Sequence, residues 1–308
     1  MPEFTSSKLL AGIRAGNIRA LAQGITLVEN NLPPASEMLR DLQHTATTQV
    51  VGITGPPGAG KSTLVNALLE VWVAEGKKIA VLAVDPSSPF NFGALLGDRV
   101  RMSTFYTNPL VYIRSFASRG SLGGLHPSLL QVTDLVKEGG FDVILVETVG
   151  VGQSEVEIAG LADCTVVALV PEAGDEIQAM KQGLLEIADI FVVNKGDRPG
   201  ADGMVKRLRN MAHERGKADG ETPVLKTAAS KNEGVAELAA AIVAQLARQD
   251  KDTSRKALLL TDKLLQYLAA REMARYSRPA IEAAVKSGLS AGKFNLYRLA
   301  DSFMETKA

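Results

Sequence analysis

Seven short apolar runs alternate with helical stretches through the middle of the chain, and this alternation restricts the fold more than any other feature. The runs are QVVGIT, KIAVLAVD, LVYIRSF, FDVILVET, CTVVALV, IFVVNK and TPVLKTA. Helical patterns lie near residues 61–75, 128–138, 175–187, 202–214 and 233–248. A strand that is apolar on both faces must be covered on both faces. The sequence therefore predicts a doubly wound α/β fold with a mostly parallel sheet.

Helical segments flank this alternating region. Residues 5–30 have apolar side chains at mostly helical spacing, NNLPPAS interrupts the pattern, and EMLRDLQHTA is a second helical piece. After about residue 250 the charged break RQDKDTSRK leads into ALLLTDKLLQYLAAREMARY and two further helical pieces. We expect three parts: an N-terminal helical extension over 1–46, the α/β domain over 47–250 and a C-terminal helical region over 251–308.

Composition limits the classes of partner. Lys plus Arg number 34 and Asp plus Glu number 34, so no net charge favours nucleic acid or an anionic membrane. No segment approaches the ~18 to 20 continuous apolar residues of a membrane span. The single cysteine and three histidines show no metal-ligand spacing, which disfavours zinc, nickel or haem. The N-terminal stretch has no apolar targeting region and carries Glu3, so we expect a cytoplasmic protein.

The stretch GITGPPGAGKST follows the apolar run VVGIT and opens a helical pattern, which is the context of a phosphate-binding loop. Gly58 and Gly60 allow backbone N–H groups to turn toward phosphates, and the helix N-terminus adds its positive dipole end. Lys61 is suited to the β- and γ-phosphates and Ser62 to Mg²⁺. The predicted nucleotide-binding residues here are Gly55, Pro56, Pro57, Gly58, Ala59, Gly60, Lys61, Ser62 and Thr63.

The run IFVVNK ends in Asn194-Lys195-Gly196-Asp197, a pattern that indicates the base. The Asp197 carboxylate would accept hydrogen bonds from the ring N–H and the exocyclic amine of guanine, whereas adenine presents a lone pair there. Lys195 can lay its alkyl stem over the base. The stretch Thr227-Ala228-Ala229-Ser230 follows the last predicted strand, and backbone N–H groups there, including those of Ala228 and Ala229, could bind the guanine oxygen. We therefore expect GTP and GDP as ligands.

A third motif, VILVETVGVGQSE, places Glu147 at the end of a buried strand. Such a carboxylate usually reaches Mg²⁺ through water, and Gly150 allows backbone to approach the γ-phosphate. Common regulatory GTPases have D-x-x-G-Q at this place, whereas here Val151 follows the glycine. We therefore expect slow intrinsic hydrolysis. Gln153 is the nearest substitute for the water-positioning glutamine, or else a solvated residue at a helix start.

Two further carboxylates are candidates for the metal site. Asp85 closes the run IAVLAVD, and Asp98 lies in GALLGDRVRM. Beside a magnesium nucleotide they can hold metal-bound waters or position the attacking water. The alternatives are a strand-end cap for Asp85 and an ion pair with Arg99 or Arg101 for Asp98. The predicted metal site comprises Ser62, Asp85, Asp98 and Glu147.

Several of these segments together identify a resemblance. GITGPPGAGKST, VLAVDPSS, LLGDRVRM, SRGSLGG, DVILVETVGVGQSE, PEAGDEIQAMKQG and VVNKGD stand in the order and approximate spacing found in methylmalonyl-CoA mutase-associated GTPases of the MeaB/ArgK type. The resemblance implies a GTPase chaperone that docks on an adenosylcobalamin-dependent acyl-CoA mutase, gates cofactor delivery and protects or reactivates that enzyme. It also implies a homodimer formed through the C-terminal helices. Ala228 departs from the family, which more often has Ser there.

The segment PEAGDEIQAMKQG has two interpretations. Asp175 and Gln178 form a capping box, which explains local helix initiation without any function. The resemblance instead implies a nucleotide-responsive switch, with Asp175, Glu176 and Lys181 near the partner. We therefore include Lys181 among the candidate catalytic residues.

Three other functions are compatible with a phosphate-binding loop. A kinase that uses ATP is disfavoured by the NKGD motif, and a GTPase that delivers nickel is disfavoured by the lack of His and Cys clusters. A nucleotide-gated binding module with incidental turnover is the third alternative.

Overall fold

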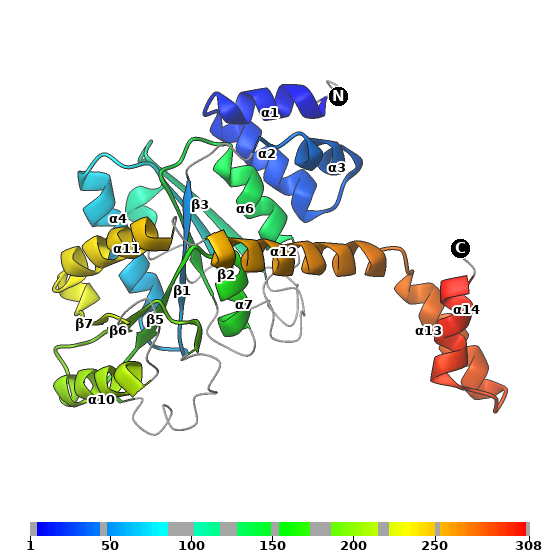
Figure 1. The fold of residues 1–308 in the computed structure, drawn as a ribbon. Coiled ribbons are helices and arrows are strands. Elements are labelled where there is room, and N and C mark those ends of the chain that lie inside the picture. The colour runs from blue at the N-terminus through cyan, green and yellow to red at the C-terminus, as the bar shows by residue number, and fades with distance from the viewer. Residues whose placement is uncertain are drawn as a thin grey trace. The chain divides into compact units, whose positions relative to one another are not determined.

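The computed structural model describes residues 5–43, 48–85, 102–117, 128–148, 154–172, 186–214, 222–249 and 253–305. The chain divides into two compact units, Met1–Lys256 and Ala257–Ala308. The first unit holds a sheet of parallel strands with helices on both of its faces (Figure 1). The second unit is helical.

The sheet contains all seven predicted strands. They are β1 (Gln49–Thr54), β2 (Ile79–Asp85), β3 (Val111–Ala117), β4 (Val143–Glu147), β5 (Cys164–Leu169), β6 (Ile190–Val193) and β7 (Val224–Lys226). Their order is β3-β2-β4-β1-β5-β6-β7, and each adjacent pair is parallel. The prediction of a doubly wound α/β fold is confirmed. Because β1 lies between β4 and β5, the loop that follows it opens between the ends of two buried strands.

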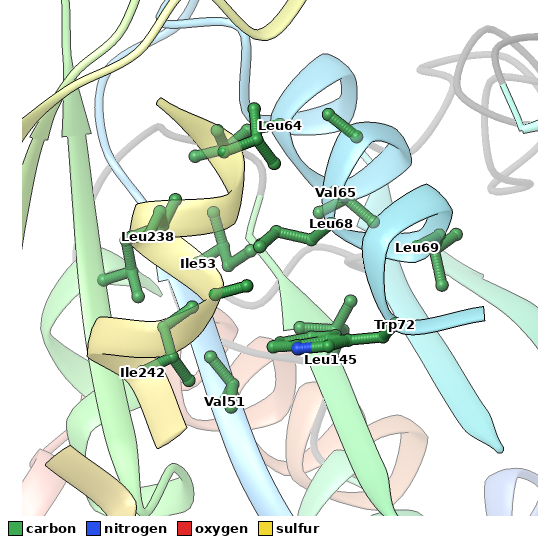
Figure 2. Close-up of a cluster of buried hydrophobic side chains, with 14 of the residues drawn as sticks. Val51, Ile53, Leu64, Val65, Leu68, Leu69, Trp72, Leu145, Leu238 and Ile242 are labelled. Carbon is green, nitrogen blue, oxygen red and sulfur yellow. The ribbon is translucent and has the colours of Figure 1, made fainter. Parts of the chain in front are cut away.

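Alternate residues of the central strands pack on opposite faces of the sheet. On one face, Val51 and Ile53 of β1 join a core cluster with α4 (Lys61–Ala74) and α11 (Val235–Gln249). Figure 2 shows Leu68 and Trp72 of α4 beside Leu238 and Ile242 of α11 in this cluster. The neighbouring residue Val50 belongs to the cluster on the other face. Full burial on both sides explains why these strands are apolar throughout.

Three sets of helices cover the second face. The helices α6 (Leu129–Lys137) and α7 (Ser154–Leu161) share a core with β1, β2, β3 and β4. The helix α10 (Ala201–Glu214) packs on β5, β6 and β7 through a smaller cluster. The remaining set comprises the N-terminal helices α1 (Ser6–Arg14), α2 (Ile18–Glu29) and α3 (Pro33–Arg40). Their side chains belong to the same cluster as those of α6.

Two expectations for the N-terminal helices are corrected. The helical pattern over 5–30 forms two helices, because Gly16 adopts a positive φ of 77° and the Asn17 side chain caps α2 by accepting from the backbone N–H of Arg19 and Ala20. The third helix begins at Pro33, within the segment expected to interrupt the pattern. Proline fits the first turn of a helix, where its missing N–H would have no helical partner.

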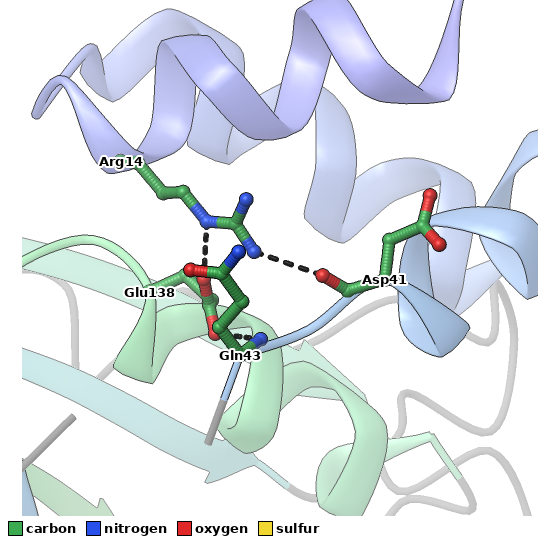
Figure 3. A network of polar contacts seen from close by, with 4 residues as sticks. All are labelled: Arg14, Asp41, Gln43 and Glu138. Atoms are coloured by element: carbon green, nitrogen blue, oxygen red, sulfur yellow. Dashed lines mark hydrogen bonds and ion pairs between the residues drawn. The ribbon is translucent and has the colours of Figure 1, made fainter. Parts of the chain in front are cut away.

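A polar network fastens this extension to the sheet domain. Arg14 donates to a Glu138 oxygen at 2.6 Å and to the Asp41 carbonyl at 2.8 Å. The other Glu138 oxygen accepts from the Gln43 N–H at 2.8 Å (Figure 3). The Glu138 side chain is only 6% exposed, so this bidentate arrangement holds a nearly buried charge. The N-terminal helices and the sheet domain therefore share a core cluster and this polar network across the boundary that we expected at residue 47.

The other helices agree in part with the sequence patterns. The predictions for 61–75, 128–138, 202–214 and 233–248 correspond to α4, α6, α10 and α11. The prediction for 175–187 falls outside the described residues apart from a helical end at 186–187. A helix start near Gln153 was one of the two alternatives for that residue, but the extent of α7 was not predicted, because a helix of eight residues gives too little periodic sequence to recognise. Two short 3₁₀ turns, Ser103–Phe105 and Ala229–Lys231, complete the first unit's described elements.

The second unit contains most of α12 (Thr253–Met273), followed by α13 (Arg278–Ser290) and α14 (Leu296–Glu305). Within it, Phe294 packs against Gly288, where an added Cβ would meet the ring at 3.2 Å. Large apolar side chains are nevertheless exposed along its helices, among them Leu264, Leu265, Leu268, Leu289 and Leu296. Within the described residues, no helix combines the length and apolar character needed to cross a membrane.

Gly52 generates a prediction about packing. An added Cβ at Gly52 would lie 2.5 Å from Ile158 Cγ1 and 3.0 Å from Ala162 Cβ, because α7 packs directly on β1. Gly52→Ala should therefore lower the free energy of unfolding by about 1 to 3 kcal/mol. Gly203→Ala is the matched control, since an added Cβ there meets nothing within 4 Å and alanine favours a helix, so it should gain about 0.5 kcal/mol.

Chemical denaturation of both variants measures the two changes. Equal unfolding free energies for Gly52→Ala and the parent would contradict the close approach of α7 to β1.

Candidate nucleotide-binding site

The phosphate loop connects β1 to α4, and three of its residues have backbone conformations that favour glycine. Gly55, Gly58 and Gly60 have positive φ angles of 138°, 78° and 80°. A Cβ at Gly55 would overlap the carbonyl oxygen of Ala168 in β5, and one at Gly60 would lie 2.5 Å from Asn194 Nδ2. The loop is therefore fitted closely against neighbouring strands. Pro57 and Gly58 form its exposed part, whereas Ala59 is buried.

Lys61 and Ser62 begin α4 and are both buried, with 7% and 5% exposure. The Lys61 ammonium donates to the carbonyl oxygens of Gly55 at 2.8 Å and Pro56 at 3.1 Å. It thus lies across the loop beside the backbone that would face phosphates. Thr63 is half-buried in the same first turn of the helix.

Ser62 contacts Glu147, which ends β4. The Ser62 hydroxyl donates to Glu147 Oε1 at 2.7 Å, and the Glu147 side chain is 3% exposed. A hydroxyl and a carboxylate are hard oxygen ligands of the kind that Mg²⁺ prefers. These two buried groups therefore fit a magnesium ion, which would lie next to the phosphate loop.

The strand register places Asp85 at the same edge of the sheet. Ala83 of β2 is the partner of Glu147 in β4, and Asp85 ends β2 two residues further on. The Asp85 side chain is not among those described. Asp98, Gly150, Gln153 and Lys181 lie outside the described residues, so their predicted roles stay predictions.

The buried amide of Asn194 connects the phosphate loop to the two loops predicted to bind the base. Its Nδ2 donates to the carbonyl oxygens of Ala59 at 2.9 Å and Gly60 at 3.4 Å. Its Oδ1 accepts from the Thr227 hydroxyl and from the Ala229 N–H, both at 3.2 Å. One side chain with 2% exposure thus fixes three segments that are distant in sequence.

The remaining residues of the NKGD segment are more exposed. Lys195 has a positive φ of 55°, and the Gly196 N–H donates to the Thr227 carbonyl at 2.8 Å. Asp197 follows at the surface, where the ammonium of Lys231 contacts its Oδ2 at 2.9 Å. This hydrogen bond from Lys231 lowers the pKa of Asp197 below its ordinary value. An ionised carboxylate can accept hydrogen bonds only, which suits the two donors of guanine.

Ala228 and Ala229 lie next to this segment, with their backbone N–H groups already bonded. Ala228 donates to the Glu233 carbonyl at 3.0 Å, and Ala229 donates to Asn194. Their predicted contact with the guanine oxygen stays a prediction.

Sequence reasoning missed Lys231, and it included Thr227 only for its backbone and not for the contact of its hydroxyl with Asn194. Lys231 belongs to the stretch TAASK that follows β7, so proximity to the predicted alanines was the available signal.

The Asn194 network generates a prediction about stability. Asn194→Ala would leave the Ala59 carbonyl and the Ala229 N–H without their side-chain partner in a buried place. We expect the free energy of unfolding to fall by about 2 to 4 kcal/mol, since unsatisfied buried polar groups are costly. Asn30→Ala, which removes an exposed amide bonded to the Thr26 carbonyl, should cost under about 1 kcal/mol. Urea denaturation compares them, and equal losses would contradict the bridging role.

Comparison with solved structures supports the same fold. The chain is similar to a structure described as LAO/AO transport system kinase, with a TM-score of 0.69 and 25% identity over 99% of this chain and 98% of that chain. A HypB structure from Helicobacter pylori in complex with nickel has a TM-score of 0.51 at 15% identity, covering 71% of this chain and 95% of that one. The second likeness shows the fold alone.

Sequence comparison identifies the family. The GTPase ArgK of Escherichia coli is 42% identical over 200 residues, which cover 63% of this chain and 60% of that protein. A Pyrococcus abyssi protein provisionally named a GTPase is 47% identical over 236 residues, covering 75% of this chain and 73% of that protein. Residues 21–279 match the family described as Methylmalonyl Co-A mutase-associated GTPase MeaB. The chain belongs to the MeaB family of GTPases.

Proposed function

We propose that this protein is a GTP-hydrolysing chaperone of an adenosylcobalamin-dependent acyl-CoA mutase, which gates cofactor delivery and protects or reactivates that enzyme. The observation that carries the proposal is the Asn194 network, because it joins a phosphate loop and a guanine-type base loop into one buried unit. The family, whose name associates its members with methylmalonyl-CoA mutase, supports the choice of partner.

Three described residues have separate proposed roles on the phosphate side of the site: Lys61, Ser62 and Glu147. Lys61 begins α4 beside the loop carbonyls and would transfer its contacts to the β- and γ-phosphates. Ser62 and Glu147 would hold Mg²⁺, with Asp85 at the adjacent strand end. When bound, the ion would neutralise negative charge on the phosphates.

The base side of the site selects guanine. The Asp197 carboxylate would accept from the ring N–H and the exocyclic amine, because both are donors on guanine. Lys195, in its left-handed conformation, follows directly after the anchored Asn194 and would lie over the base. GTP and GDP would therefore bind with the same base contacts and differ only at the phosphate end.

Hydrolysis by the isolated protein should be slow. Val151 occupies the place where common regulatory GTPases have a water-positioning glutamine. We assign the missing function to groups that a bound mutase would order, with Asp98, Gln153 and Lys181 as candidates. Glu172, the second residue of the segment PEAGDEIQAMKQG, pairs with Arg198 next to the NKGD residues at 2.6 Å.

The helical second unit is the proposed dimerisation region. Its exposed leucines, Leu264, Leu265 and Leu268 on α12, are an apolar surface of the kind that a second copy of the chain would cover. Balanced charge and the composition support a cytoplasmic protein that binds neither nucleic acid nor membrane.

One alternative is favoured by a specific observation. One of the two similar solved structures is described as LAO/AO transport system kinase. Transfer of phosphate from ATP to a protein or small molecule is therefore the second candidate function. A chaperone GTPase hydrolyses GTP without an acceptor substrate, whereas a kinase requires one and would use ATP. Phosphate release measured with each nucleotide separates these two functions.

The base assignment generates a prediction. Asp197→Asn should weaken GTP binding and improve binding of xanthosine triphosphate, because the amide can donate to the additional carbonyl of xanthine, which a carboxylate would repel. Competition calorimetry with both nucleotides measures the change of preference. A variant that keeps the parent's preference for GTP would show that the NKGD segment does not bind the base.

The mutase assignment generates a second prediction. Saturating acyl-CoA mutase should accelerate steady-state phosphate release from GTP, and nucleotide should shift mutase affinity by the same factor as mutase shifts nucleotide affinity. Lys181→Ala should remove most of the stimulation while basal hydrolysis stays close to the parent's.

Lys206→Ala, which removes an exposed lysine from α10, is the matched control and should keep the parent's stimulation. Equal stimulation of the Lys181 variant and the parent would exclude the switch role. An unstimulated parent would contradict the chaperone role itself.

A further inference from the structure

The ion pair between Lys231 and Asp197 lies at the end of the site where the base would bind. We propose that Lys231 is a positioning residue for guanine recognition, which holds the Asp197 carboxylate oriented toward the base. This inference rests on the proposed role of Asp197 as the group that binds guanine. It adds a specificity-determining residue to that role.

The contact itself is short and solvent-facing. The Lys231 ammonium lies 2.9 Å from Asp197 Oδ2, with side-chain exposures of 53% and 34%. Ala228, three residues earlier in the same stretch, carries only a methyl group and cannot donate a hydrogen bond from its side chain. The side chain of this stretch that contacts the Asp197 carboxylate in the structure is that of Lys231.

The backbone that carries Lys231 is held on both sides. The Lys231 N–H donates to the Ala228 carbonyl at 2.8 Å, within the 3₁₀ turn Ala229–Lys231. Asn232 follows with a positive φ of 56°, and its Nδ2 donates to Glu70 Oε2 at 2.7 Å. Since Glu70 lies on α4, the turn is tied to the helix that begins with the phosphate-binding Lys61.

These anchors limit the movement of the lysine to its own side chain. A charged group on a fixed backbone loses less entropy when it forms a contact than one on a mobile loop. Lys231 is thus preorganised to restrain Asp197 before any base arrives.

Lysine and guanine can bind the carboxylate together. A carboxylate has about four lone-pair sites. The ammonium occupies one on Oδ2, which leaves sites on both oxygens for the ring N–H and the exocyclic amine of guanine. The lysine therefore restrains the carboxylate without taking the place of the base.

Charge adds to orientation. The hydrogen bond from Lys231 and, at longer range, the charge of Arg198 lower the pKa of Asp197. Asp197 in turn raises the pKa of Lys231, with a smaller contribution from Glu233. Because guanine donates to the ionised carboxylate, GTP affinity should fall as the pH falls through the pKa of Asp197. Removing Lys231 should raise that pKa toward its ordinary value, so the loss of affinity should begin at a higher pH.

The ion pair between Lys231 and Asp197 is too exposed to contribute much to the stability of the fold. Exposed ion pairs contribute little to folding, because solvent screens the charges. A variant without the lysine should therefore fold normally, and changes in nucleotide binding can be measured on an intact protein.

The experiment compares Lys231→Ala, Lys231→Arg and the control Lys286→Ala by calorimetry with GTP and inosine triphosphate. Lys286 is an exposed lysine paired with Glu282 at 2.7 Å, so its loss matches the charge change. We expect Lys231→Ala to weaken GTP about fivefold and the arginine variant to restore affinity. Inosine triphosphate lacks the exocyclic amine and makes one fewer bond to Asp197, so it should lose less. Lys286→Ala should match the parent.

The same titrations repeated at decreasing pH supply a readout that a structural role would not move. The proposal requires the acid loss of GTP affinity to begin at higher pH in Lys231→Ala than in the parent.

Three results would overturn the proposal. Tighter GTP binding by Lys231→Ala would mean that the lysine occupies the place of the base. Unchanged affinity and an unchanged pH profile would mean that the pair has no part in recognition. An Asp197→Asn variant that keeps its preference for GTP over xanthosine triphosphate would remove the underlying base assignment, whereas a normal result for that variant with no effect at Lys231 would reject the lysine alone.

Discussion

The hydrogen bonds of one buried amide determine how the candidate site is assembled. Asn194 follows β6 directly, yet its side chain bonds both to the phosphate loop after β1 and to the stretch after β7. Parallel strands place these loops at one edge of the sheet, but the strand ladder alone does not fix their conformations. A single group that both donates and accepts does so, because its dipole is satisfied only when all three segments are in place.

The strands and the phosphate loop could be predicted because their signals are local. A strand buried on both faces is apolar along nearly all of its length, and β1 and β4 are clear examples, with polar residues only at their ends. The glycines of the loop are equally informative, since Gly55 and Gly60 have conformations and close contacts that exclude other residues. Sequence spacing also placed Glu147 at a strand end near Ser62, and the two are bonded in the structure.

The parts that sequence did not reveal depend on contacts between distant segments. The pair of Lys231 with Asp197 joins residues whose neighbours belong to different loops, and nothing in the letters TAASK distinguishes a functional lysine from a surface one. The packing of α7 could not be predicted for a related reason: the helix lies against Gly52 of β1, about 100 residues away in the sequence. Long-range packing of this kind leaves no periodic pattern.

The N-terminal helices α1, α2 and α3 are part of the core that covers one face of the sheet. Leu21, Ile25 and Met38 are completely buried against the cluster that includes Val132 and Leu135 of α6. A shortened chain that starts at residue 47 would therefore expose an apolar strip on α6 and leave Glu138 without Arg14. Such a fragment would be prone to self-association even with every nucleotide-binding residue present. A fragment designed to keep α6 covered would therefore retain α1, α2 and α3.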